Sequence, residues 1–179
     1  MYNADGSRGA MAGNALRCMA KYLYDNNIVR KDVMTIETDT GVKTVTVSTT
    51  NGKVTSAAVD MGYATLDTTA LHLNLPEKEI VDYPVTIGGE EYAINTEFIR
   101  VVNKNTIKMR VWERGSGETL ACGSGACAAV VAAVANNLCS KGSDVTVKVR
   151  GGDLVVNYTD EKVTLTGDAK LVYTGQAEY

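Results

Sequence analysis

The chain has 179 residues, of which 45% are hydrophobic, and a formal net charge of −3. This is the composition of a globular protein that can bury a core as one domain or two small ones. Lysines and arginines are scattered among acids, so no basic surface is expected and nucleic acid is not an expected partner. The longest apolar run, 126–135, is half of the roughly 20 residues that cross a bilayer, and residues 1–9 do not resemble a signal peptide. We therefore expect no membrane association, a cytoplasmic location and four reduced cysteines.

The first predicted element is a helix that starts at Gly13 and ends near Asn26. Apolar residues recur on one face of this helix: Leu16, Met19, Ala20 and Leu23. Threonine- and valine-rich segments of alternating pattern then predict antiparallel strands at 33–39, 43–50 and 53–61, separated by glycine turns.

The pattern weakens between residues 62 and 84, where both prolines and the single histidine, His72, are found. This composition favours a linker, with His72 at the surface. Strands are predicted to resume at 83–89, 91–103 and 106–115. A helix at 126–137, apolar nearly all round, should be buried, and further strands are predicted at 144–152, 153–160 and 162–167.

An internal repeat relates the two halves of the chain. The segment MAGNALRCMA at Met11 aligns with ACGSGACAAV at Ala121, an offset of 110 residues, and the following strands at Thr35 and Thr146 align with a slip of one residue. The repeat predicts an α+β fold of two pseudo-symmetric units, each a mostly antiparallel sheet or barrel around a central helix. The two helix N-termini would face each other across a cleft.

A helix N-terminus carries unpaired N–H groups and about half a positive charge, which suits a substrate carboxylate and also stabilises a thiolate. Cys122 precedes the second helix, so it is a candidate base, although a small apolar filler at a turn would fit the same pattern. Cys18, Cys127 and Cys139 are interpreted as structural. Their spacing contains no close cysteine pair or cysteine–histidine pair, so no zinc or other metal site is predicted. The glycine-rich turn lacks the lysine of a nucleotide-binding P-loop.

Two long motifs resemble the active-site motifs of the diaminopimelate epimerase family. NADGSRGAMAGNALRC, residues 3–18, is similar to the first motif, and ERGSGETLACGSGACAA, residues 113–129, is similar to the second. The C-terminal strands are also similar, so the resemblance covers most of the chain. It implies a cofactor-independent isomerase of two pseudo-symmetric domains that binds diaminopimelate and interconverts its LL and meso forms, in lysine and peptidoglycan precursor synthesis, and it suggests a homodimer.

On this resemblance the domains are residues 1–65, a crossing at 66–84, and 85–179, with the return of the last few residues to the first domain as an alternative. In the family one cysteine removes the α-proton and a second, on the opposite face, returns a proton. Cys122 matches one of these cysteines.

The resemblance also implies a set of substrate-binding residues. Glu113 and Arg114 match residues that hold the distal amine and carboxylate of the substrate, where a guanidinium pairs with a carboxylate in a fork. The other matched positions line the pocket or form the two turns: Asn3, Gly13, Asn14, Asn95, Gly123 and Ser124. Without the motif, the asparagines would be interpreted as turn residues and Glu113 as part of a solvated ion pair.

The chain departs from the family pattern at the position of the other catalytic cysteine, which is Ala12. It also lacks the strands that precede NADGS in the family and a GNPH-containing segment before NTEF. Three hypotheses follow. The chain is a diaminopimelate epimerase impaired by Ala12, a non-catalytic binding module or fragment that needs a partner chain, or a related two-cysteine racemase of the proline racemase kind.

Overall fold

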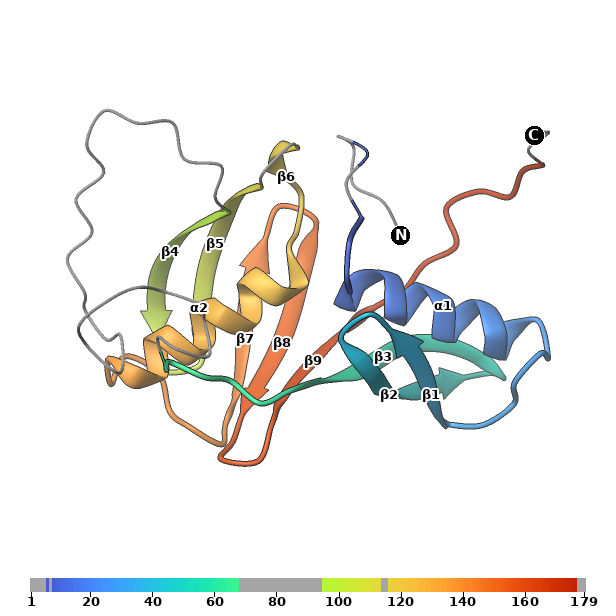
Figure 1. Ribbon diagram of the computed structural model, residues 1–179, viewed down its shortest axis with the longest axis horizontal. Coiled ribbons are helices and arrows are strands. Elements are labelled where there is room, and N and C mark those ends of the chain that lie inside the picture. The colour runs from blue at the N-terminus through green and yellow to red at the C-terminus, as the bar shows by residue number, and fades with distance from the viewer. Residues whose placement is uncertain (1–5, 7, 68–94, 114–115, 177–179) are drawn as a thin grey trace.

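The computed structural model describes residues 6, 8–67, 95–113 and 116–176, which form two helices and a nine-stranded sheet (Figure 1). The strand predicted at 83–89, His72, Asn3 and Arg114 lie outside the described residues. In chain order the elements are α1 (Gly13–Asp25), β1 (Val33–Thr38), β2 (Gly41–Thr50), β3 (Lys53–Gly62), β4 (Thr96–Asn103), β5 (Thr106–Glu113), β6 (Gly117–Thr119), α2 (Gly123–Ala135), β7 (Asp144–Val149), β8 (Gly152–Tyr158) and β9 (Val163–Asp168).

The α+β fold with two similar units is confirmed. Each unit consists of a helix followed by three antiparallel strands, α1 with β1, β2 and β3, and α2 with β7, β8 and β9. Asn26 and Asn136 end the two helices at equivalent positions, and each is followed by an asparagine of positive φ, Asn27 and Asn137. Asparagine tolerates this left-handed conformation better than most side chains, so the repeat extends to the helix ends.

The two units join at their last strands. β3 pairs antiparallel with β9, so the sheet runs in the order β1-β2-β3-β9-β8-β7-β5-β4, and the short β6 pairs with β5. Equivalent strands that pair antiparallel are related by a local twofold axis between them. That axis brings the N-terminal ends of α1 and α2 towards each other at the centre of the molecule (Figure 1).

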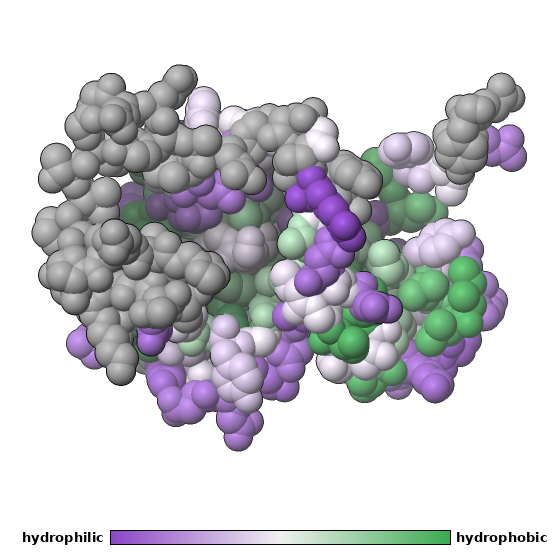
Figure 2. Space-filling view, in the orientation of Figure 1, coloured by the Kyte–Doolittle hydropathy of each residue, from purple (hydrophilic) through white to green (hydrophobic). Residues whose placement is uncertain are grey.

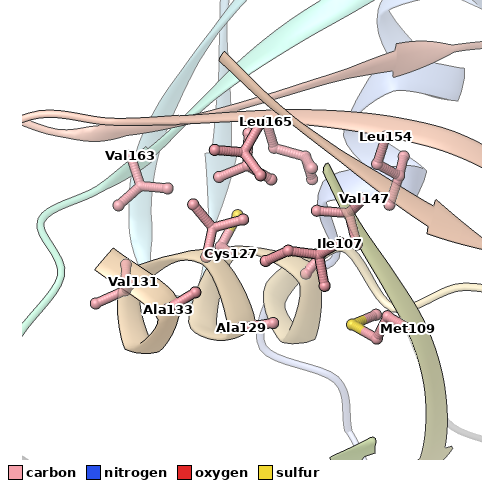
Figure 3. Close-up of a cluster of buried hydrophobic side chains, with 14 of the residues drawn as sticks. Ile107, Met109, Cys127, Ala129, Val131, Ala133, Val147, Leu154, Val163 and Leu165 are labelled. Carbon is pink, nitrogen blue, oxygen red and sulfur yellow. The ribbon is translucent and has the colours of Figure 1, made fainter. Parts of the chain in front are cut away.

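Each helix packs a separate hydrophobic cluster against the sheet. The cluster around α2 includes fully buried Ile107 and Leu165 (Figure 3), together with Val130. The cluster around α1 includes Val45 and Val59. Met61 packs against both clusters, which links them. As predicted, α2 is buried on nearly all sides.

The buried face of α1 differs from the prediction. Met19 is 46% exposed, whereas Arg17 is only 5% exposed and takes a place in the interior. The reason is a gap above Gly167 in β9: a Cβ there would lie 2.9 Å from Arg17 Cζ, so the absence of a side chain leaves room for the guanidinium. Cys18 is exposed as well, so its interpretation as a structural residue is wrong, whereas Cys127 and Cys139 are buried.

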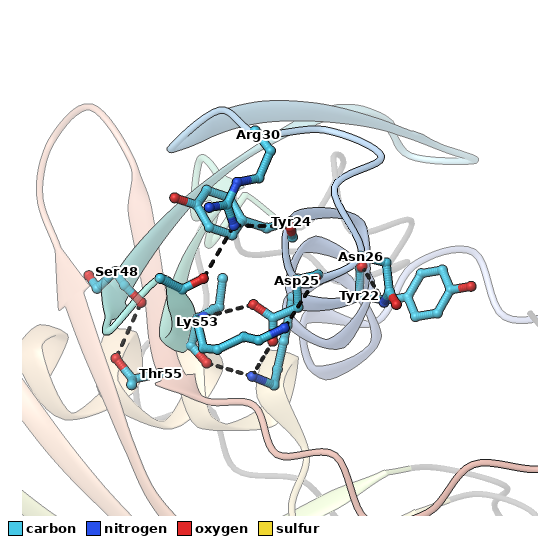
Figure 4. A network of polar contacts seen from close by, with 11 residues as sticks. Tyr22, Tyr24, Asp25, Asn26, Arg30, Ser48, Lys53 and Thr55 are labelled. Atoms are coloured by element: carbon cyan, nitrogen blue, oxygen red, sulfur yellow. Dashed lines mark hydrogen bonds and ion pairs between the residues drawn. The ribbon is translucent and has the colours of Figure 1, made fainter.

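A polar network fixes the C-terminal end of α1 to the β2–β3 turn (Figure 4). The Asp25 carboxylate accepts hydrogen bonds from Lys21 Nζ at 2.7 Å and from the Val54 N–H at 2.9 Å. Lys21 Nζ also donates to the Val54 carbonyl at 2.6 Å.

Hydrophobic residues are visible at the surface of the α1 unit (Figure 2). Its exposed hydrophobic side chains include Ile28 and Val33. In the described part of the chain, neither helix is long and apolar enough to cross a membrane.

Candidate functional site

Cys122 caps the N-terminus of α2. Its backbone is extended, with φ −125° and ψ 118°, and its Sγ accepts a hydrogen bond from the Gly125 N–H at 3.3 Å. Ser124 Oγ lies 3.5 Å from the same sulfur. A thiolate at this position would therefore receive a backbone donor, a hydroxyl and the positive end of the helix dipole.

The segment that leads into Cys122 is held from outside α2. The Gly151 N–H, in the β7–β8 turn, donates to the Leu120 carbonyl at 2.8 Å. A Cβ on Gly151 would lie 3.2 Å from that carbonyl oxygen, so the absence of a side chain permits the close approach. Cys122 is thus fixed by its own helix on one side and by a neighbouring turn on the other.

Ala12 occupies the equivalent position at the N-terminus of α1. Its backbone is also extended, with φ −140° and ψ 120°, and its methyl group provides no capping bond. The first-turn N–H groups of α1 are left without a side-chain acceptor from the N-cap residue, so they remain able to bind a carboxylate.

The two helix N-termini meet over one side chain. A Cβ on Gly13 would lie 2.6 Å from Leu165 Cδ2, and a Cβ on Gly123 would lie 2.8 Å from the same atom. The Gly123 Cβ would also lie 3.3 Å from Asn14 Oδ1. The glycines thus allow both helices to approach Leu165 and each other.

Asn14 contributes a polar atom at this junction. Its Oδ1 is buried and has no hydrogen-bond partner among the described residues. A buried acceptor without a partner costs about 1–3 kcal/mol, so a donor supplied from outside the chain would be favoured at this position.

Carboxylates from the neighbouring strands lie beside α2. Glu113, at the end of β5, accepts a hydrogen bond from Thr119 Oγ1 in β6. Glu97, in β4, lies against Gly125: a Cβ there would meet Glu97 Cδ at 2.9 Å and Oε1 more closely still. Burial, and then the negative charge of Glu113, raise the pKa of the Glu97 carboxyl.

The other buried thiol of α2 does not compete with Cys122. Burial, together with the neighbouring Cys122, raises the pKa of Cys127 to about 12, although Arg17 opposes the shift. Cys127 is therefore a neutral thiol at physiological pH.

The structure brings together part of the predicted site. Ala12, Gly13, Asn14, Cys122, Gly123 and Ser124 all lie at the two adjoining helix N-termini. Glu113 lies at the α2 side of the sheet, and Asn95 directly precedes β4, next to the Thr96 that pairs with Trp112 of β5. Asn3 and Arg114 are not among the described residues.

Sequence reasoning missed Glu97, Thr119 and Leu165. Glu97 lies two residues beyond Asn95 in the quoted NTEF segment, and the alternation of β4 places its side chain on the face of Val101, which packs on the core. The alternation could therefore have identified Glu97 from the sequence. No sequence pattern indicates Thr119 or Leu165, because their roles depend on contacts between distant segments.

Comparison with known proteins gives the family. Residues 1–66 and 83–178 match the diaminopimelate epimerase family. The chain is 38% identical to the diaminopimelate epimerase of Geobacillus kaustophilus over 220 residues, which cover 100% of this chain and 76% of that protein. It is 34% identical to that of Acetivibrio thermocellus, over 99% of this chain and 78% of that protein. The first alignment is longer than the 179 residues of the chain, so the relative carries internal residues that this chain lacks.

Solved structures show the same fold at low identity. A hydroxyproline epimerase from Agrobacterium vitis has a TM-score of 0.63 and 14% identity, over 92% of this chain and 66% of that one. A phenazine biosynthesis protein of the PhzF family from Enterococcus faecalis has a TM-score of 0.65 and 16% identity, over 96% of this chain and 74% of that one. The family match, the identity to the bacterial relatives and the shared fold agree: this chain belongs to the diaminopimelate epimerase family.

Proposed function

We propose that the chain binds diaminopimelate and exchanges the proton on its α-carbon, with Cys122 as the base. The observation that carries the proposal is the position of Cys122 Sγ, which caps α2 and accepts the Gly125 N–H beside a second helix N-terminus. Preorganised donors of this kind stabilise the charge that develops when a weak carbon acid loses a proton.

The two helix N-termini suit the α-carboxylate of the substrate. Each provides first-turn N–H groups and positive potential, and Gly13 and Gly123 leave the backbone accessible at close range. The side chains of Asn14 and Ser124 add polar groups at the same junction. A carboxylate held there would keep the α-carbon near Cys122.

The distal end of the substrate is assigned to Glu113 and Arg114. The Glu113 carboxylate, held by Thr119, would take the distal ammonium group, and Arg114 would take the distal carboxylate. Asn3 and Asn95 are proposed to line the same pocket. A substrate with two charged ends is therefore favoured over a simple amino acid.

The alanine at position 12 limits which steps of the epimerisation this chain can carry out. The Cys122 thiolate takes the α-proton from one face of the carbon, and the electron pair stays on the carbanion, which recovers a proton from the same thiol. Without a thiol at position 12 no group there delivers a proton to the opposite face. The expected outcome is exchange of the α-hydrogen with solvent and retention of configuration.

Incubation of each stereoisomer of diaminopimelate in heavy water tests this proposal. Deuterium should enter the α-position of one configuration, while LL-to-meso conversion stays below that of the Ala12→Cys variant by about 10²–10⁴-fold, the usual worth of a positioned acid or base. Cys122→Ala should abolish the exchange. An Ala12→Cys protein that is folded and has an alkylatable thiol at position 12, yet converts no faster, would contradict the mechanism.

Replacing Glu113 tests substrate choice within the same class of enzyme. Glu113→Gln should weaken binding of diaminopimelate more than binding of proline or another amino acid with one charged end. Equal weakening would favour a related two-cysteine racemase. A stable chain that binds diaminopimelate without any exchange would favour a non-catalytic binding module.

We also propose the assembly, location and domain limits that the family suggests. These are a homodimer, a cytoplasmic location, and domains at 1–65 and 85–179 with a crossing at 66–84. Sedimentation of the purified chain would test the homodimer directly.

A further inference from the structure

Glu97 lies on the buried side of its strand. It pairs with Val111 of β5, which in turn pairs with Thr119 of β6, so the three side chains share one face of the sheet. Val111 is 2% exposed and belongs to the cluster around α2. The Glu97 side chain is therefore directed at α2, although it stands near the start of an edge strand of the described sheet.

The contact partner of Glu97 is the first turn of α2. A Cβ added at Gly125 would lie 2.9 Å from Glu97 Cδ and 3.0 Å from Cγ, so the carboxyl group rests on the bare backbone of this glycine. The N–H of the same glycine donates to Cys122 Sγ. Glu97 thus touches the residue that holds the sulfur in place.

The charge state of Glu97 fits this position. The titratable group that acts on it electrostatically is Glu113 on β5. Burial and the negative charge of Glu113 raise the pKa of Glu97, which favours the neutral acid. A neutral carboxyl packs against the helix without cancelling the positive potential at its N-terminus, which an ionised one would do.

We propose that Glu97 is a positioning residue for Cys122, because its carboxyl group packs on Gly125 and fixes the turn whose N–H donates to the sulfur. The significance of this role rests on the proposed function, in which Cys122 is the base. The role itself concerns only the geometry of the turn and the reactivity of the thiol.

The test is the rate of alkylation of Cys122 by iodoacetamide between pH 6 and 9. Mass spectrometry of the Cys122 peptide separates this reaction from that of the exposed Cys18. Glu97→Gln keeps the length of the side chain and a polar end group that packs on Gly125, so its rate should stay within about twofold of the unmodified chain. Glu97→Asp withdraws the carboxyl by one methylene and should slow alkylation about tenfold, since a hydrogen bond to a charged group is worth roughly that factor or more.

A double-mutant cycle separates positioning from general loosening. Gly125→Ala should also slow alkylation about tenfold, because the new methyl group displaces the carboxyl. In Glu97→Ala/Gly125→Ala the space is free, so the double variant should react no more slowly than Glu97→Ala alone. Glu118→Gln is the matched control. Glu118 pairs with Arg110 and Arg150 at the opposite face of the strands, and its loss should leave the Cys122 rate unchanged.

The results decide between two causes. The positioning role is supported if the alkylation rates of the variants follow this pattern while their urea midpoints do not. Equal rates for Glu97→Asp and the unmodified chain, or multiplicative effects in the cycle, would overturn it. Absence of α-hydrogen exchange would refute the proposed function and leave the alkylation results valid.

Discussion

Leu165 supports both helix N-termini, and its removal gives the sharpest test of the junction. The side chain is fully buried, and its Cδ2 atom is the nearest neighbour of a Cβ placed at either Gly13 or Gly123. Leu165→Ala should lower the free energy of unfolding by about 3–5 kcal/mol, the range for a fully buried leucine whose cavity does not collapse.

The same contact predicts how glycine substitutions depend on Leu165. Gly123→Ala alone should cost about 1–3 kcal/mol, because the new methyl group would lie 2.8 Å from Leu165 Cδ2 and one of the two must move. In the Leu165→Ala background that obstacle is gone, and the nearest remaining atom, Asn14 Oδ1, lies 3.3 Å away. The glycine substitution should then be nearly neutral, which gives a coupling energy of about 1–2 kcal/mol.

Urea unfolding of the four proteins in the cycle measures this coupling, with the midpoint and the slope determined separately. Val163→Ala is the control, because Val163 lies in the same cluster and is 3% exposed but is not among the nearest atoms to either glycine. Its effect should add to that of Gly123→Ala. Simple additivity in the Leu165 cycle as well would show that the helix N-termini do not meet over this side chain.

Three further predictions concern ionisable side chains that are buried or half-buried. Arg17→Met should raise the free energy of unfolding by about 1–3 kcal/mol, since burial lowers the pKa of Arg17 and its Nη1 has no partner among the described residues. A lower free energy of unfolding, measured with urea, would contradict this. Asp25→Ala should cost about 1–3 kcal/mol near neutral pH, because it leaves the Val54 N–H unpaired and removes the carboxylate partner of Lys21. Burial raises the pKa of Asp25, but these two hydrogen bonds outweigh it and lower the pKa overall. The stabilising contribution of Asp25 is therefore present above the ordinary aspartate range and is lost as pH falls through the lowered pKa, which should show as a falling urea midpoint. The urea midpoint of Glu97→Gln should equal that of the unmodified chain at pH 4 and exceed it as pH rises. The reason is that a carboxyl with a raised pKa loses its stabilising contribution when it ionises. A difference in midpoint that stays constant with pH would contradict this.

The repeat and most of the strands could be predicted from the sequence because they depend on local patterns. Alternation located β1, β2, β3, β5, β7, β8 and β9 to within a few residues. The strand β6, Gly117–Thr119, has too few residues for a period to show, and it exists because β5 provides a partner. The start of α2 was predicted three residues late, because the glycine-serine-glycine segment has low helix propensity while Cys122 caps the helix.

The interior of the site could be predicted only in part, because its contacts join distant segments. The motif indicated Cys122 as a reactive thiol, but the depth of Arg17 depends on the missing side chain at Gly167, 150 residues further along the chain. The position of the Glu97 carboxyl group depends in the same way on the missing side chain at Gly125. A helical stripe in a sequence does not show where another element leaves a gap, so Met19 was assigned to the interior in place of Arg17.

The local twofold gives the proposed mechanism two equivalent helix N-cap positions, residues 12 and 122. β3 and β9 pair antiparallel, and the helices that precede them begin at equivalent points on either side of Leu165. A substrate bound between these helix N-termini would be approached from opposite sides by residues 12 and 122. Ala12 and Cys122 have nearly the same backbone conformation, with φ/ψ of −140°/120° and −125°/118°. A thiol introduced at position 12 would thus meet an extended N-cap backbone like that of Cys122, which is why the proposed function expects Ala12→Cys to restore inversion.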